Sequence, residues 1–270
     1  MAGLTILMPV DEREPLDAPP HPAKTKDEVV RRAFAMRALV YRVELELQSQ
    51  GSNFAENQVA TSMVRETVVP ALQENDLWDE LTAFEQQTLT KPVGSWQPAE
   101  LFSLSWLSES LSVLIWSLGI LDELQPWDTM MDPSPVLTLF DLAGEDSGHW
   151  VSSVELRDAE EIADAQFAAE IWHWRGRTQA MLLGLIPFQA PQGQRADEFL
   201  GPILQYTAEE AEKSGILRRI DGDFPAYGQP YRNARDQQFH LLMSIASERH
   251  HALNWLVGFG LKWDDVSMDT

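Results

Sequence analysis

Residues 101–121, with the sequence LFSLSWLSESLSVLIWSLGIL, decide the fold class of this 270-residue chain. The stretch contains one charged side chain, Glu109, so its length alone would allow a membrane span. Six serines lie within it, however, acidic residues flank both ends, and no cluster of lysines or arginines marks a cytoplasmic side. We therefore expect a buried helix that begins near Pro98 and runs through Leu118, with Gly119 at its C-terminal end.

Two faces of this expected helix are apolar. At about 100° per residue, the leucines and Ile115 form one face, and Phe102, Trp106 and Trp116 lie almost opposite. A helix that is apolar on two sides is normally sandwiched in the core. Glu109 projects from the aromatic face, where an ionised carboxylate needs a cation close by.

The last expected helix, over about residues 233–257, supplies a candidate cation. Arg249 lies within about 40° of the centre of its apolar stripe, where an arginine must reach solvent or be paired. We therefore predict that Glu109 and Arg249 form a buried pair, with Arg37 of the first helix as the competing partner. Such a pair is either part of a functional site or a structural ion pair, which is the more ordinary case.

Helical periodicity extends over the rest of the chain. It predicts helices over residues 26–48 and 56–72, a short helix after the capping box at Thr82, another short helix over 133–142, and a long helix from Asp158 to about Leu183. A second capping box at Thr207 predicts a helix that ends near Gly215.

Prolines and glycines mark two segments that we do not expect to be helical. Five prolines between residues 9 and 22 predict that residues 1–23 are an extended or disordered arm. Residues 224–231 favour a small β-hairpin around Gly228. We therefore expect residues 24–270 to form one compact all-α domain of six to eight helices.

The composition excludes several classes of function. The chain has 20 basic and 42 acidic residues, a formal net charge of −22, and no cysteine. The missing cysteine excludes disulfides, thiolate metal sites and a cysteine nucleophile. The charge argues against binding to duplex nucleic acid or to an anionic membrane surface. Residues 1–10 do not form a convincing signal peptide, which favours a cytoplasmic location.

The negative charge is concentrated in the middle of the chain. Residues 66–156 hold 16 acidic side chains and a single basic one, Lys91. This segment is either a solvated face that keeps the protein in solution or a surface that attracts a basic protein partner. The candidate partner-binding residues are Asp122, Glu123, Trp127, Asp128, Asp132, Asp141, Glu145, Asp146 and Trp150.

Two Glu-x-x-His motifs allow a metal-dependent enzyme as the alternative. Glu170 and His173 lie one helical turn apart, and so do Glu248 and His251. This is the spacing found in carboxylate-bridged di-iron bundles, where two further helices each donate a glutamate. The motif is only two residues long in a glutamate-rich chain, so we expect no metal and no other cofactor.

Three strings of residues carry a family resemblance. They are Ser247–Leu256 with Trp263–Thr270, Ser105–Glu109 with Leu114–Gly119, and Leu156–Arg157 with Glu161–Asp164 and Trp172–Arg175. Over about residues 25–270 the chain resembles the mainly bacterial domain-of-unknown-function family numbered 4272. The resemblance implies a helical domain and transfers no catalytic residue.

The sequence thus favours a non-enzymatic, cytoplasmic binding protein whose acidic surface engages a basic protein. An immunity protein that neutralises a toxin is one concrete form of this hypothesis, and it rests on charge alone.

Overall fold

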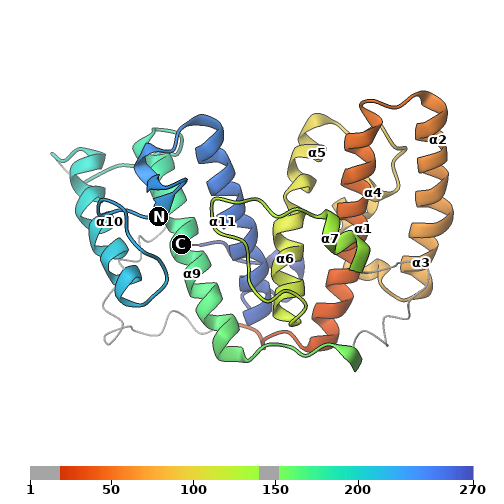
Figure 1. The fold of residues 1–270 in the computed structure, drawn as a ribbon, viewed down its shortest axis with the longest axis horizontal. Helices are drawn as coiled ribbons and strands as arrows, with labels where there is room; N and C mark the ends of the chain where they lie inside the picture. Colours follow the sequence, from red (N-terminus) through yellow and green to blue (C-terminus); the bar gives the residue numbers. More distant parts are fainter. Residues whose placement is uncertain (1–18, 140–151, 192, 270) are drawn as a thin grey trace.

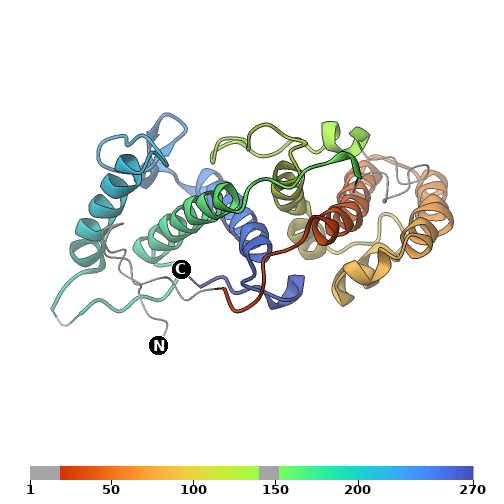
Figure 2. The same ribbon diagram turned by 90° about the horizontal axis from the view of Figure 1, so that it is seen from below.

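The computed structural model describes residues 19–139, 152–191 and 193–269, which form an elongated row of helices (Figure 1). From one end to the other, the row contains α10 (Ala196–Lys213), α9 (Ala159–Leu182), α11 (Asp236–Val257), α6 (Leu107–Ser117), α1 (Lys26–Ser49) and α2 (Phe54–Met63). The view from below shows the same order, with α11 between α9 and α6 (Figure 2). The prediction of an all-α fold is confirmed.

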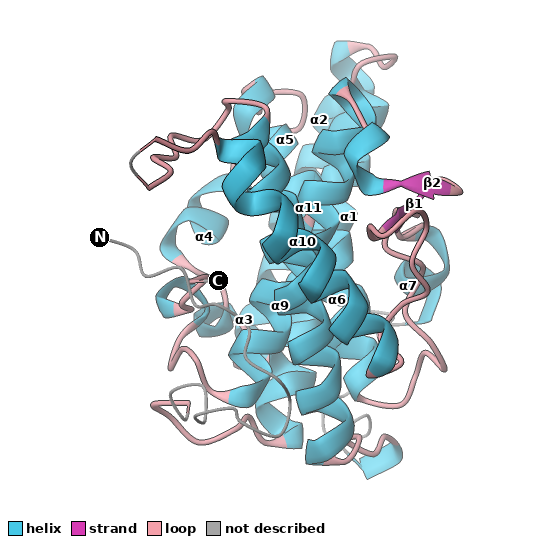
Figure 3. Ribbon diagram, turned by 90° about the vertical axis from the view of Figure 1, so that its left-hand side faces the viewer, coloured by secondary structure: helices cyan, strands magenta, loops and turns pink. Residues whose placement is uncertain are grey.

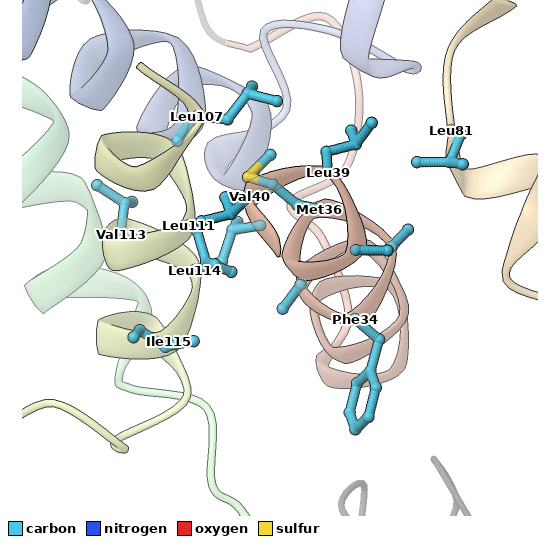
Figure 4. Packing of buried hydrophobic residues seen from close by; sticks show 14 of the residues in the cluster. Phe34, Met36, Leu39, Val40, Leu81, Leu107, Leu111, Val113, Leu114 and Ile115 are labelled. Carbon is cyan, nitrogen blue, oxygen red and sulfur yellow. The ribbon is translucent and has the colours of Figure 1, made fainter. Parts of the chain in front are cut away.

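Helix α1 starts where its sequence predicts. The Thr25 hydroxyl accepts the backbone N–H of Glu28, and the Glu28 carboxylate accepts the backbone N–H of Thr25. These two bonds satisfy donors that the first turn of a helix leaves free. Packing of α1 against α6 then builds the main core. Figure 4 shows Met36 and Val40 of α1 facing Leu111 and Leu114 of α6.

The expected single helix over residues 98–118 is divided, and this is a correction. Helix α5 (Pro98–Ser105) ends at Trp106, and α6 begins at Leu107. The hydroxyl of Ser105 donates to the Phe102 carbonyl, and the Glu109 N–H bonds to Trp106 only three residues back. Such local bonds compete with the regular ladder of a helix. Phe102 consequently lies 62% exposed instead of being sandwiched.

The segment after α1 forms a helix with one wide turn. Helix α2 continues through a π-helical turn, η2 (Val64–Val68), into α3 (Val69–Glu74). Here the Val69 N–H reaches the Val64 carbonyl five residues back, directly before Pro70, whose ring cannot enter a regular ladder. A 3₁₀ turn, η3 (Trp78–Glu80), leads to α4 (Ala83–Leu89), where the capping box predicted at Thr82 is present.

Short α7 (Ser134–Leu139) and long α9 also lie where the sequence predicts them. Helix α10 does not. It begins at Ala196, so Thr207 lies inside the helix and caps nothing. Pro202 falls in its second turn, yet Leu200, Thr207, Ala208 and Ala211 remain on one buried face. Burial of that face outweighs the one hydrogen bond that the proline removes.

The predicted hairpin is present, next to the helix that ends the fold. Strand β1 (Pro225–Ala226) pairs antiparallel with β2 (Gln229–Pro230) around Gly228, and a 3₁₀ turn, η4 (Tyr231–Asn233), leads into α11. Figure 3 views the row from the α10 end and shows the hairpin at its edge. After α11, a last 3₁₀ turn, η5 (Trp263–Asp265), packs back on the core.

The expected N-terminal arm lies mostly outside the described residues, but its last part is ordered. The His21 N–H donates to the Gly258 carbonyl at 3.2 Å, and the Lys24 N–H donates to the Leu256 carbonyl at 2.8 Å. These two bonds hold residues 21 and 24 against the end of α11. In the described parts of the chain, none of the helices combines the length and the apolar character that a membrane span requires.

Candidate functional site

Glu109 and Arg249 form a buried ion pair between α6 and α11. Arg249 Nε donates to Glu109 Oε2 at 2.9 Å, and the two side chains are 0% and 1% exposed. The other oxygen, Oε1, accepts the backbone N–H of Met131 at 2.6 Å. Arg249 also donates to the carbonyls of Gln125 and Thr129, so the pair fastens the loop over these residues to the core. Arg37 is buried too, but it donates to the Leu137 carbonyl of α7.

The same arrangement recurs at three other buried arginines. Each guanidinium pairs with a carboxylate and lies over an aromatic ring, which combines an ion pair with a cation–π contact. The four sets are Arg249 with Glu109 and Trp127, Arg32 with Glu85 and Trp263, Arg42 with Glu46 and Trp96, and Arg175 with Asp223 and Tyr231. Of the four sets, the sequence predicts the Glu109–Arg249 pair, because the other charged residues lie beside an apolar stripe or in a turn.

Arg32 and Glu85 form the pair that borders a cleft. Arg32 donates to both oxygens of Glu85, at 2.9 and 2.7 Å, and its guanidinium carbon lies 4.3 Å from the centre of the Trp263 ring. On one side of Trp263 lies a cleft of about 320 Å³ between α4, α5, α11 and the C-terminal segment. Its charged lining residues are Glu85, Glu248 and Asp264.

Glu248 is the one of these carboxylates with a strongly shifted pKa. Burial raises its pKa to about 7, and the nearby charges of Glu109 and Glu85 add to the effect. A hydrogen bond from the Ser110 hydroxyl to Oε2, at 2.9 Å, opposes it. No cation pairs with Glu248 in the parts of the chain that the structure describes. A carboxyl group with this pKa, on the wall of a cleft, has the features of a functional residue.

The histidines of the two Glu-x-x-His motifs lie apart in different surroundings. His173 Nδ1 lies 3.0 Å from Nδ1 of His250, whereas His251 packs against the Trp263 ring. Burial lowers the pKa of His173 to about 4 and that of His250 to about 3, so both rings are neutral. Within the described ranges no three His, Asp or Glu side chains come together as metal ligands. The geometry therefore does not assemble Glu170, His173, Glu248 and His251 into one centre.

The sequence model of one family, described as Domain of unknown function (DUF4272), matches residues 7–182. The chain belongs to this family. The matched part contains Glu109, Arg32 and Glu85, whereas Glu248, Arg249 and Trp263 follow it. The C-terminal strings that carry the resemblance in the sequence thus lie outside the DUF4272 match. No curated protein and no solved structure matches the chain.

The predicted partner-binding residues of this DUF4272 protein fall into four groups. Trp127 is packed between Arg249 and the stacked ring of Trp172, and Asp128 accepts the backbone N–H of Tyr227, so both have structural contacts. Asp132 is exposed but accepts the Ser134 N–H at the start of α7. Asp122 and Glu123 are exposed. Asp141, Glu145, Asp146 and Trp150 lie outside the described residues.

Exposed carboxylates gather around the start of α9, and we call this set the α9 acidic surface. The Arg157 backbone N–H bonds to the Ser117 carbonyl and its guanidinium to the carbonyls of Leu121 and Asp122, which brings the end of α6 to this place. Among the residues that the structure describes, only Glu161 forms an ion pair with Arg157. The surface consists of Asp122, Glu123, Glu155, Asp158, Glu160, Glu161 and Asp164, all exposed.

Proposed function

We propose that this protein binds a basic protein partner through the α9 acidic surface. The observation that carries the proposal is that these carboxylates are exposed and, apart from Glu161, form no ion pair within the described structure. The one arginine among them, Arg157, directs most of its donors to the backbone carbonyls of Trp116, Leu121 and Asp122. Its hydrogen bonds tie loops together, and its single positive charge offsets only one of the carboxylates of the surface.

Other acidic residues of the middle segment form ion pairs instead. Glu80, Glu85 and Glu100 pair with Arg31, Arg32 and Lys91. The acidic residues at the start of α9 keep their charge unpaired, so the electrostatic potential there is strongly negative, and this gives the proposal its location. A potential of this kind accelerates the approach of a positively charged protein more than it raises the final affinity.

Affinity capture from the native host tests the location. The test variant neutralises four exposed positions of the surface that cap no helix: Asp122→Asn, Glu123→Gln, Glu155→Gln and Asp164→Asn. The matched control removes the same charge elsewhere, at Glu66, Glu74, Asp79 and Asp265, all of which are exposed. We expect the wild type and the control to retain one basic protein and the test variant to lose it.

Equal capture by the test variant and the control would contradict the proposal, provided that both variants keep the unfolding temperature of the wild type. A toxin neutralised in the cytoplasm is the kind of partner that fits this proposal most simply, since rapid association is what neutralisation requires. The metal-dependent alternative has no comparable support, since its four residues do not converge.

A further inference from the structure

We propose a second site, independent of the α9 acidic surface: the cleft beside Trp263 binds a small organic cation, an ammonium or guanidinium group on an apolar stem. The cleft lies between α4, α5, α11 and the C-terminal segment, on the side of Trp263 that carries Glu248. Its volume of about 320 Å³ is at the lower end of the range that small-molecule sites occupy.

The charges that line the cleft have one sign. Glu85, Glu248 and Asp264 contribute carboxylates, and no lysine or arginine of the described residues belongs to the lining. Glu85 is neutralised by Arg32, but Glu248 and Asp264 have no ion-pair partner among the residues that the structure describes. His251, the remaining titratable group of the wall, is neutral because burial and Arg32 lower its pKa to about 4. A cation that enters the cleft therefore meets two carboxyl groups without an ion-pair partner, and Glu248 is ionised above about pH 7.

Glu248 has one oxygen available for such a ligand. Its Oε2 accepts the Ser110 hydroxyl at 2.9 Å, and no hydrogen bond to Oε1 occurs within the described structure. Burial in a site with two further acids, Glu85 and Glu109, makes its ionised form costly. A ligand ammonium group would remove that cost, because an opposite charge close by favours ionisation.

The remaining walls suit an apolar stem. Phe84, Leu104, Leu107, Met268 and the Trp263 ring line the cleft, and the serine hydroxyls of Ser103 and Ser247 add acceptors for N–H groups. The Trp263 ring already contacts one cation, because the Arg32 guanidinium lies 4.3 Å from its centre. An aromatic face in an anionic cleft is the usual arrangement for the recognition of organic cations.

Calorimetry and ligand-detected NMR with 2-phenylethylamine, and with its neutral analogue 2-phenylethanol, test the proposal. Blocked lysine (N-acetyl-lysine methylamide) is the third probe, because the same cation could arrive as a free amine or as a protein side chain. We expect the amine to bind at pH 8 at least tenfold more tightly than the alcohol. The blocked lysine should bind more tightly than the free amine if a side chain is the natural ligand, and more weakly if a free amine is.

The Glu248→Gln variant tests whether the amine binds in the cleft at Glu248. It should weaken amine binding at least tenfold at pH 8, whereas Glu66→Gln, at an exposed carboxylate outside both the cleft and the α9 acidic surface, should leave binding unchanged. Because Glu248 is ionised only above about pH 7, wild-type affinity should fall about tenfold from pH 8 to pH 6. Equal binding of amine and alcohol, no binding of either cation at about 10 mM, or unchanged affinity in a folded Glu248→Gln variant would overturn the proposal.

Discussion

Arg249 places both Nε and Nη2 within 2.9 Å of a single oxygen of Glu109, and the other oxygen of Glu109 accepts the Met131 N–H. The pair therefore joins α6, α11 and the loop that contains Gln125 and Thr129. Two charges in the core are stable together because each satisfies the other, and their hydrogen bonds replace those lost from water.

Removal of one partner should strand the other. We expect Arg249→Met to lower the free energy of unfolding by about 3–5 kcal/mol, because Glu109 stays buried without a cation. The Glu109→Gln/Arg249→Met double variant should lose much less than the sum of the two single losses. Urea unfolding of the four proteins at pH 7 measures this, and additive losses would show that the two side chains do not interact.

Glu248 should make the folded protein less stable as the pH rises. Burial raises its pKa from 4.5 to about 7, so the folded protein holds a proton that the unfolded chain releases. The stabilisation is fully present below pH 4.5 and is lost as the pH rises through 7. The wild type should therefore lose about 2–3 kcal/mol relative to Glu248→Gln between pH 4.5 and 8.

The Glu248→Gln comparison isolates one carboxyl group. The lowered pKa values of His173, His250 and His251 destabilise the folded protein as the pH falls below 6.5. Both proteins contain these histidines, so their effect cancels in the difference. Parallel stability curves for the two proteins over this pH range would contradict the assignment to Glu248.

Gly258 should be required for the contact of the N-terminal segment. A Cβ there would lie 2.2 Å from the His21 carbonyl oxygen, at a φ of +100°. Gly215 ends α10 with a φ of +75° and has open space around it. Both substitutions to alanine should cost about 1–2 kcal/mol in backbone strain. The total loss of unfolding free energy should be clearly larger for Gly258→Ala, because its new Cβ also collides with the His21 carbonyl oxygen. Trypsin should also cut the Gly258→Ala protein faster after Lys24. Equal effects of the two substitutions would refute the close approach.

Asp223 should hold the hairpin to α9. Its carboxylate accepts Nε and Nη2 of Arg175 and the backbone N–H groups of Phe224 and Arg232. Burial alone would raise the pKa of Asp223, but Arg175 and these bonds hold it below its usual value of 3.8. Asp223→Asn should cost about 3–5 kcal/mol, because Arg175 is left buried without a counter-charge. The loss should be equally large at pH 7 and pH 5 in thermal unfolding; its disappearance at pH 5 would be inconsistent with a lowered pKa.

The sequence predicts most of the helices because their signals are local. Thr82 starts a helix because both halves of its capping box lie within four residues, and the Glu109–Arg249 pair follows from two charges on core-facing stripes. Thr207 has the same capping-box pattern as Thr82, yet α10 begins earlier in the chain and continues past Thr207. The burial of Leu200 and Ala211 on one face of α10 decides this, and that burial depends on the tertiary fold.

The site contains relationships that no local pattern reveals. The local sequence around Asp223 predicts only a turn, but its carboxylate accepts a hydrogen bond from Arg175, which lies 48 residues earlier in the chain. The helix is interrupted at Trp106, so the angles calculated for one straight helix do not hold for Phe102, which is exposed. The cleft joins Glu85, Glu248 and Trp263 from three segments. Their proximity depends on how the helices pack, which spacing along the chain does not encode.

The association rate of the captured partner as a function of salt tests the central claim most directly. Exposed charges are screened over about 8 Å at physiological ionic strength and over about 30 Å at 0.01 M. We predict that the wild type associates at least about tenfold faster at low salt, and that the Asp122, Glu123, Glu155 and Asp164 variant loses most of this dependence. An association rate that is the same at both salt concentrations would contradict steering by the α9 acidic surface.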